Sequence, residues 1–172
     1  MSPPRLVVCM GVAGCGKSTL AQILADRWGW EMVEADHFHS AANQARMAAG
    51  VGLTDTERQP WMDVVCDELR DHRRRQHNVV LAHSALRRSA RDRLRGCGLR
   101  AMFIHLTATP ALIGRRLARR KRHFAGAELL TSQYLDLQSP AGEPDVVSLD
   151  AALSPKSLAR RAEALMQQLE LT

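Results

Sequence analysis

Two hydrophobic patterns alternate along this chain. Short apolar runs, typical of buried parallel strands, lie at 6–10, 31–35, 78–82, 101–106 and 146–149. Between them, apolar residues recur at helical spacing over Lys17–Trp28, Asp55–Arg75, Leu86–Arg95, Thr109–Arg122 and Pro155–Leu169. Strands that alternate with helices predict an α/β fold with a five-stranded parallel sheet covered on both faces. Ligands of such sheets bind beyond the carboxyl ends of the strands, so the residues that follow each strand matter most.

Helix caps support this assignment, and the chain shows no internal division. Thr54 is followed by Glu57 three residues later, and Ser154 by Pro155, both typical of helix starts. Repeats, linkers and low-complexity tracts are absent from the sequence. We therefore expect residues 1–172 to form one domain with a sizeable core.

The cysteines and the N-terminus bear on location. The four cysteines (Cys9, Cys15, Cys66 and Cys97) lack metal-ligand or C-x-x-C spacing, which predicts free thiols in a reducing compartment. Because the first predicted strand begins at residue 6, we expect no signal peptide, and no stretch of about 18 apolar residues occurs in the sequence. We expect a cytoplasmic protein without a membrane partner.

The charge balance is basic, with a formal net charge of +6. Of the 24 basic residues only Lys17, Lys121 and Lys156 are lysines. A basic chain suits nucleic acid or small anionic substrates. The alternative is that the high arginine content only reflects the base composition of the genome. Because aromatic residues make up only 4% of the chain, a base-stacking platform is not predicted. We expect no nucleic-acid partner and a few functionally placed arginines.

The strongest motif is GVAGCGKS at Gly11–Ser18, which fits the phosphate-binding loop pattern between a predicted strand and a predicted helix. The glycines let backbone N–H groups face phosphate oxygens, Lys17 reaches the β- and γ-phosphates, and the Ser18 hydroxyl can coordinate Mg²⁺. This predicts binding of ATP with Mg²⁺. The predicted nucleotide-binding residues are Gly11, Val12, Ala13, Gly14, Cys15, Gly16, Lys17, Ser18 and Thr19.

Cys15 inside this loop has two interpretations. It is a small filler at a variable position, or its thiolate is favoured by Lys17 and the following helix N-terminus, which would make the loop sensitive to alkylation.

Chemistry-bearing residues also follow the second and third strands. Asp36 lies 19 residues beyond Lys17, where a carboxylate can accept a substrate hydroxyl proton or hold Mg²⁺ through water; the alternative is a turn or capping role. His37 and His39 lack a third nearby ligand, so no metal site is predicted there. Ser84 with Arg87 and Arg88 places a hydroxyl and two cations at the same edge; the alternative is a helix cap at Ser84 with solvated arginines.

The densest charge run, Arg115–Phe124, contains Arg116 and Arg120 on one helix face. In isolation such a run is a solvated face. In a phosphoryl-transfer protein, an arginine segment late in the chain is suited to a lid that neutralises the moving charge.

These blocks together resemble the gluconokinases, small phosphate-loop kinases that phosphorylate D-gluconate with ATP. The resemblance spans Gly11 to about Pro140. Besides the loop, the matching segments are Glu34–Ser40, Asn43–Met47, Gly50–Met62 with Leu53, Thr54, Asp55, Arg58, Pro60 and Trp61, Ser84–Arg87 with Arg91 and Asp92, and Arg116, Leu117, Arg120, His123, Phe124 and Leu129–Gln133.

The resemblance implies a nucleoside/shikimate-kinase-like three-layer sandwich with a substrate-binding helical segment at about 37–63 and a helical lid at about 115–132. It also implies a homodimer that phosphorylates the 6-hydroxyl of D-gluconate. The implied catalytic residues are Lys17, Asp36 and Arg120, and the lid residues that meet ATP are Arg116 and Arg120. The implied substrate residues are Asp36, His39, Arg58, Ser84, Arg91, His123 and Gln133, with Ser18 as the metal ligand.

Several residues depart from the family pattern: Ala35 replaces a glycine, His37 an aspartate, Ser40 and Gly52 prolines, Ala90 a tyrosine and Ser139 a glutamate. These departures preserve the phosphotransferase prediction and bear on which sugar acid is used. Two alternatives remain: a kinase for another small hydroxy acid such as shikimate, and a nucleotide- or nucleic-acid-binding module without turnover.

Overall fold

The computed structural model describes residues 2–119 and 127–171, and its centre is a parallel sheet. Its five strands stand in the order β2-β3-β1-β4-β5, and every neighbouring pair is parallel. The strands are β1 (Arg5–Met10), β2 (Glu31–Glu34), β3 (Val79–Ala82), β4 (Arg100–Thr107) and β5 (Val146–Asp150). The predicted five-stranded parallel sheet is confirmed.

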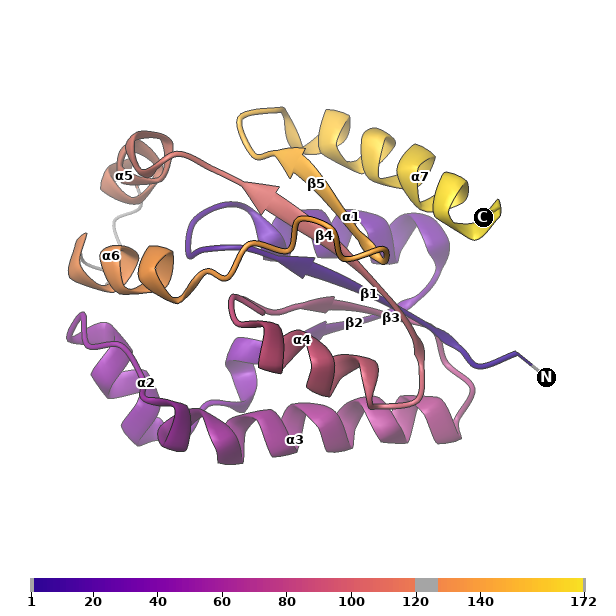
Figure 1. Ribbon diagram of the computed structural model, residues 1–172, viewed down its shortest axis with the longest axis horizontal. Coiled ribbons are helices and arrows are strands. Elements are labelled where there is room, and N and C mark those ends of the chain that lie inside the picture. Colours follow the sequence, from indigo (N-terminus) through magenta and orange to yellow (C-terminus); the bar gives the residue numbers. More distant parts are fainter. Residues whose placement is uncertain (1, 120–126, 172) are drawn as a thin grey trace.

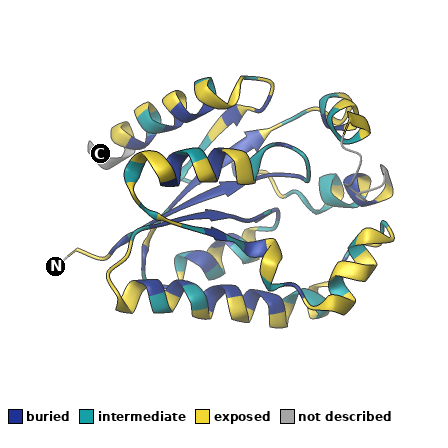
Figure 2. Ribbon diagram, turned by 180° about the vertical axis from the view of Figure 1, so that it is seen from behind, coloured by how far each residue is buried: buried dark blue, intermediate teal, exposed yellow. Residues whose placement is uncertain are grey.

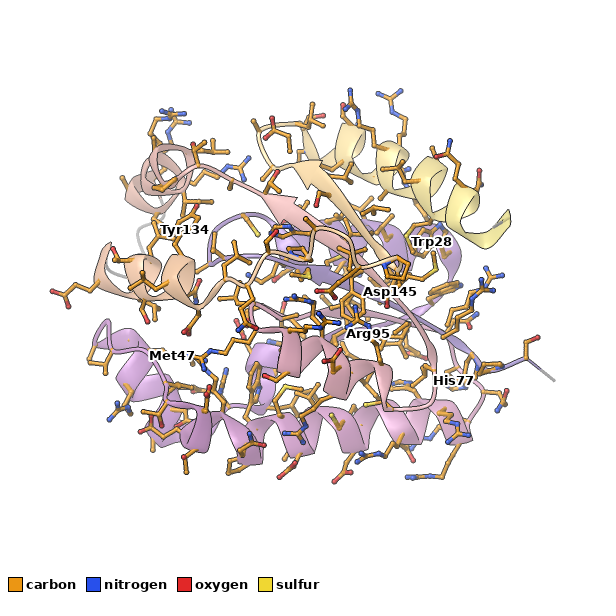
Figure 3. The ribbon with its side chains drawn as sticks, in the orientation of Figure 1. Trp28, Met47, His77, Arg95, Tyr134 and Asp145 are labelled. Carbon is orange, nitrogen blue, oxygen red and sulfur yellow. The ribbon has the colours of Figure 1, made fainter. Side chains whose placement is uncertain are left out.

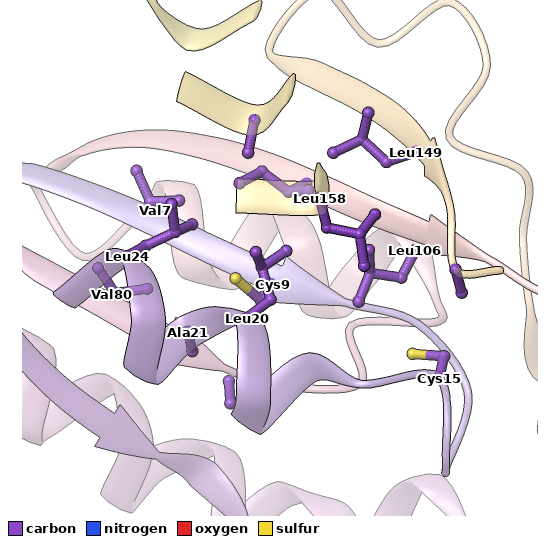
Figure 4. Close-up of a cluster of buried hydrophobic side chains, with 14 of the residues drawn as sticks. Val7, Cys9, Cys15, Leu20, Ala21, Leu24, Val80, Leu106, Leu149 and Leu158 are labelled. Atoms are coloured by element: carbon purple, nitrogen blue, oxygen red, sulfur yellow. The ribbon is translucent and has the colours of Figure 1, made fainter. Parts of the chain in front are cut away.

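Helices cover both faces of this sheet (Figure 1). One face carries α1 (Lys17–Trp28) and α7 (Pro155–Leu171), and the other carries α3 (Asp55–Arg74) and α4 (Arg88–Arg95). Alternation along β1 explains how one strand serves both layers, because successive side chains point to opposite faces. Val7 and Cys9 pack in the cluster with α1 and α7 (Figure 4), whereas Leu6 and Val8 pack in the cluster with α3 and α4. The predicted three-layer sandwich is confirmed.

The predicted caps also form. The Thr54 hydroxyl accepts from the Glu57 N–H while the Glu57 carboxylate accepts from the Thr54 N–H, a complete capping box at the start of α3. The Ser154 hydroxyl accepts from the N–H of Ser157 at 3.2 Å in the first turn of α7. Ser84 does not cap α4, which begins four residues later at Arg88, so the capping alternative for Ser84 is wrong.

Shorter elements gather beyond the carboxyl ends of the strands (Figure 1). They are a 3₁₀ turn, η1 (Ala35–Phe38), and the helices α2 (Ala41–Ala48), α5 (Pro110–Arg119) and α6 (Ala127–Asp136). No residue of α2 is buried (Figure 2). Ser40, which stands in the place of a family proline, caps α2 by accepting from the Asn43 N–H at 3.1 Å.

Within the described residues, none of the helices combines the length and apolar character that a membrane crossing requires.

Candidate active site

A cavity of about 650 Å³ opens at this carboxyl edge, and the phosphate-binding loop forms one of its walls. Gly11, with φ of 144°, is required here because an added Cβ would lie 2.8 Å from both the Cys15 Sγ and the Leu106 carbonyl oxygen. Six predicted nucleotide-binding residues line the cavity: Ala13, Gly14, Gly16, Lys17, Ser18 and Thr19. The first turn of α1 carries no acidic side chain, so its N–H groups and its dipole favour an anion at this wall.

Hydrogen bonds within the loop and to α6 help to hold the loop. The Lys17 ammonium donates to the Val12 carbonyl oxygen at 3.1 Å. The Ala13 N–H donates to the side-chain oxygen of Gln133 at 2.6 Å, which ties α6 to the loop. Gln133 therefore lies beside the loop, in the cavity that it also lines.

The Cys15 side chain is fully buried and packs in the apolar cluster beneath the loop (Figure 4). Gly11, Val12 and Cys15 do not line the cavity and support the loop from behind. An alkylating reagent therefore lacks access to this thiol in the folded chain. The burial favours the filler interpretation of Cys15.

Asp36 lies in η1, directly after β2, and its exposed carboxylate lines the cavity. The position of this turn is fixed by Trp61 of α3, whose indole N–H donates to the Ala35 carbonyl oxygen at 2.7 Å. Trp61 itself stacks between two imidazoles, with ring centroids 4.1 Å from His39 and 4.6 Å from His83. The three stacked rings form a rigid wall beside the Asp36 carboxylate.

Both histidines of this stack are held neutral. Burial lowers the pKa of His39, and this outweighs the attraction of Asp36, whose carboxylate oxygen lies 3.9 Å from the His39 Nε2. Burial, reinforced by the charge of Lys17, lowers the pKa of His83 to about 3. The His83 Nδ1 accepts from the Ala85 N–H at 2.8 Å, so the ring proton resides on Nε2, next to the Met62 sulfur.

We expect acid to destabilise the protein through His83. Its pKa is about 3 in the folded chain and about 6.5 in the unfolded chain. Below pH 6.5 the unfolded chain therefore binds a proton that the folded chain excludes, and stability falls as the pH falls from about 6.5 towards 3. This group alone should lower the free energy of unfolding by ~2 kcal/mol between pH 7 and pH 5.

Urea unfolding of wild type and His83→Asn at both pH values measures this, since the asparagine oxygen can still accept from the Ala85 N–H. His37→Asn, on the exposed side of η1, is the matched control. In His83→Asn, the free energy of unfolding should fall less between pH 7 and pH 5, by the contribution of the one proton that His83 would bind. Equal dependence in wild type and His83→Asn would contradict the assignment.

Two arginines line another part of the cavity wall, and both are paired with carboxylates. Arg58 of α3 and Arg87, which precedes α4, both line it, and each forms ion pairs with Asp55 and with Asp136 of α6. Ser84 also lines the cavity, and its carbonyl oxygen accepts from the Gly11 N–H at 3.2 Å. The segment that follows β3 thus connects the phosphate-binding loop to the part of the cavity wall that contains Arg87.

Arg91 is placed elsewhere, which corrects the expectation that it contacts substrate. Its fully buried guanidinium donates to the carbonyl oxygens of Ala85 and Leu86 and to the Glu143 carboxylate at 2.6 Å. Hydrogen bonds from Arg91, opposed by burial and reinforced by Arg95, lower the pKa of Glu143 to about 2. The N–H groups of Arg91 therefore all donate within the protein interior, because a buried guanidinium must find acceptors.

This structural network continues to the surface. Arg95 donates to Asp145, and the two side chains lie together between α4 and the segment before β5 (Figure 3). Arg91 and Arg95 therefore join α4 to that segment and do not line the cavity beside the phosphate-binding loop.

Of the residues predicted for the lid, Arg116 of α5 donates to the carbonyl oxygens of Cys15 at 3.1 Å and Ala151 at 2.5 Å. It lies outside the cavity lining and connects α5 to the back of the loop. Tyr134 of α6 reaches the α5 side of the molecule (Figure 3), where its hydroxyl donates to the Ala108 carbonyl oxygen at 2.7 Å. Arg120 and His123 lie outside the described residues.

Metal ligands do not cluster in this part of the chain. Across residues 2–119 and 127–171, no group of three or more His, Cys, Asp or Glu residues could hold a metal ion.

The sequence indicates no role for three residues that shape this site, Trp61, His83 and Asp136. Trp61 stands within a segment that resembles the family, where the pattern assigns it no role, although an indole N–H on a buried helix face must find an acceptor. Asp136 stands at the end of α6, and no local pattern links it to arginines 78 and 49 residues away.

A glycine-rich phosphate loop after the first strand of a parallel sheet, facing a carboxylate after the second, defines a phosphate-loop kinase fold. A family model described as an AAA domain matches residues 6–144. The gluconokinase of Gluconobacter oxydans is 41% identical over 88% of this chain and 85% of that protein. The thermoresistant gluconokinase of Escherichia coli K12 is 34% identical over 85% of this chain and 84% of that protein.

Solved structures agree. A sugar kinase from Janibacter sp. HTCC2649 superposes with a TM-score of 0.90 at 37% identity, covering 96% of this chain and 95% of that one. A gluconokinase from Sinorhizobium meliloti 1021 gives a TM-score of 0.87 at 32% identity, covering 98% and 95%. The chain belongs to the gluconokinase family.

Proposed function

We propose that this protein transfers the γ-phosphoryl group of ATP to the 6-hydroxyl of D-gluconate. The observation that carries the proposal is a single cavity lined by the phosphate-binding loop, by Asp36 and by the arginines Arg58 and Arg87. The cavity therefore offers an anion site for phosphates, a carboxylate for a hydroxyl proton, and cations for an acid. Relatives named gluconokinase over most of their length support this choice of substrate.

On the nucleotide side, the loop N–H groups and Lys17 hold the phosphates, which the acid-free first turn of α1 permits. The Ser18 hydroxyl, exposed at the cavity wall, fits an Mg²⁺ ligand. When bound with ATP, Mg²⁺ neutralises charge on the phosphate oxygens. The Ala13 N–H donates to Gln133, so this contact ties α6 to the loop.

On the substrate side, the Asp36 carboxylate orients the attacking hydroxyl and takes its proton. The hydroxyl oxygen bonds to the γ-phosphorus as the bond to the bridging oxygen of ADP breaks. His39 and Ser84 face the polyol chain, and Arg58 serves the carboxylate of the acid. Ala90, where the family has a tyrosine, also lines the wall and leaves room near these groups.

The helices α5 and α6 serve as the lid, with Arg116 as its hinge-side anchor and Arg120 as the group that meets the transferring phosphoryl. One domain, a homodimer and a cytoplasmic location remain predictions from the sequence.

A coupled ADP-release assay tests the function. We expect turnover with D-gluconate to exceed that with other aldonates, shikimate and nucleosides by at least about tenfold in kcat/KM, a difference of ~1.4 kcal/mol. Preferred turnover of shikimate would establish the alternative kinase. Salt-sensitive binding to random RNA without any ADP release would establish the binding module instead.

A further inference from the structure

Four charged side chains close a ring at the substrate wall of the cavity. Arg58 donates from one Nη atom to Asp55 at 3.5 Å and from the other to Asp136 at 2.5 Å. Arg87 repeats this arrangement, with 2.5 Å to Asp55 and 2.6 Å to Asp136. Each carboxylate therefore spans both guanidiniums, one oxygen to each.

The two carboxylates of the ring differ in their surroundings. The Asp136 side chain is 13% exposed and does not line the cavity, whereas the Asp55 side chain is 61% exposed and lines it. Although burial opposes it, hydrogen bonds from Arg87 and Arg58 lower the pKa of Asp136, which keeps that carboxylate charged. Asp136 is thus the inner support of the arginine pair, and Asp55 is its cavity-side partner.

This arrangement is a ready-made carboxylate site. A planar guanidinium binds carboxylate oxygens in a fixed direction, so two guanidiniums already spanned by one carboxylate suit another of the same shape. The contact between Arg58 and Asp55 is the longest in the ring, and Asp55 regains water readily because it is mostly exposed. A carboxylate that enters from the cavity can replace Asp55 without disturbing Asp136.

We propose that Arg58 and Arg87 together form the subsite for the carboxylate of the substrate, that Asp136 is the positioning residue that aligns them, and that Asp55 is the carboxylate that the substrate displaces. The proposal rests on the proposed function, since it assumes an acid substrate. It adds Arg87, Asp136 and Asp55 to the groups that set specificity for an acid over a neutral polyol.

The assembly also links the two halves of the site. Asp136 and Gln133 lie three residues apart on α6, and they hold the arginine pair and the Ala13 N–H of the phosphate-binding loop respectively. Residues three apart on a helix share one face. The same face of α6 therefore supports both the acid subsite and the phosphate subsite.

The test compares D-gluconate with D-glucitol, which carries CH₂OH in place of the carboxylate. Arg87→Gln should raise KM for D-gluconate roughly 10- to 100-fold, the usual effect of losing a hydrogen bond to a charged group, and change kcat/KM for D-glucitol less than about threefold. Arg88→Gln is the matched control: it removes the same charge from the next residue, whose side chain is 71% exposed. It should leave KM and kcat/KM for both substrates unchanged.

Substitution of the two aspartates should change KM for D-gluconate in opposite directions. Asp55→Asn should lower KM for D-gluconate severalfold because a competing carboxylate is removed. Asp136→Asn should raise it about fivefold or more, with kcat kept, because the guanidiniums lose their alignment. A purely electrostatic effect would lower KM in both variants, since each removes a negative charge.

The outcomes separate the two proposals. Wild type that does not phosphorylate D-gluconate contradicts the proposed function itself. Wild type that does so, with Arg87→Gln equal to Arg88→Gln, overturns the subsite and leaves the function standing. Equal losses for D-gluconate and D-glucitol in Arg87→Gln, or a lower KM in Asp136→Asn, overturn it as well, and thermal melting of each variant verifies that it is folded.

Discussion

Asp36→Asn should reduce kcat for D-gluconate at least about a hundredfold, equivalent to ~2.7 kcal/mol of transition-state stabilisation. An asparagine keeps the size of the side chain and can still accept a hydrogen bond, but it cannot take up the proton of the attacking hydroxyl. The fold should tolerate the change, because the carboxylate is exposed and the turn is held by the bond from Trp61 to the Ala35 carbonyl oxygen.

The measurement is kcat and KM by coupled ADP release, together with the Kd of Mg·ATP by calorimetry. Nucleotide affinity should stay within about threefold of wild type, since Asp36 belongs to the substrate side of the cavity. His37→Asn is the matched control and should keep full activity, because His37 is exposed and does not line the cavity. A folded Asp36→Asn variant with near-normal turnover would remove Asp36 from the proposed mechanism.

The sheet and the large helices follow from the sequence because their side chains are sorted by burial. In β1 the alternating residues serve two different apolar clusters, so the entire strand reads as an apolar run. Helices α1 and α3 each keep a buried face, which produces helical spacing of the apolar residues. The bounds expected for α1 match the observed helix at both ends.

The sequence does not predict the bounds of the small helices α2 and α6. Helix α2 buries no residue, and α6 contributes Leu129 and Leu130 to the interior in only its first turn. Helices α2 and α6 span only eight and ten residues. Helical spacing of apolar residues becomes recognisable over about 11 residues or more, so each helix is too short to show it clearly.

Arg91 and Arg87 show where motif reasoning ends. Both stand in one family segment, and the segment does lie beside the cavity. Residue spacing along the chain does not reveal that Arg91 turns inward to Glu143 while Arg87 faces the cavity. That choice depends on which acceptors the distant segments bring near, namely Glu143 before β5 and Asp136 on α6.

Lys17→Met should lower kcat by about 10² to 10³, the cost of removing one preorganised donor from a site where charge develops. In the described structure the ammonium donates to the Val12 carbonyl oxygen of the same loop, so it is already held beside the phosphate-binding N–H groups. The charge on the β- and γ-phosphate oxygens changes as the phosphoryl group moves, which is why the loss should appear mainly in kcat.

Coupled ADP release gives kcat, calorimetry gives the Kd of Mg·ATP, and thermal melting reports the fold. Lys17→Arg should not restore activity, because a planar guanidinium does not fit the position of a compact ammonium between the loop and the phosphates. Lys156→Met on the exposed side of α7 removes an equal charge and should be silent. If Lys17→Met turned over within about threefold of wild type while binding Mg·ATP normally, the transferring phosphoryl would have to be stabilised by other groups, and the cavity wall formed by α1 would lose its proposed role in catalysis.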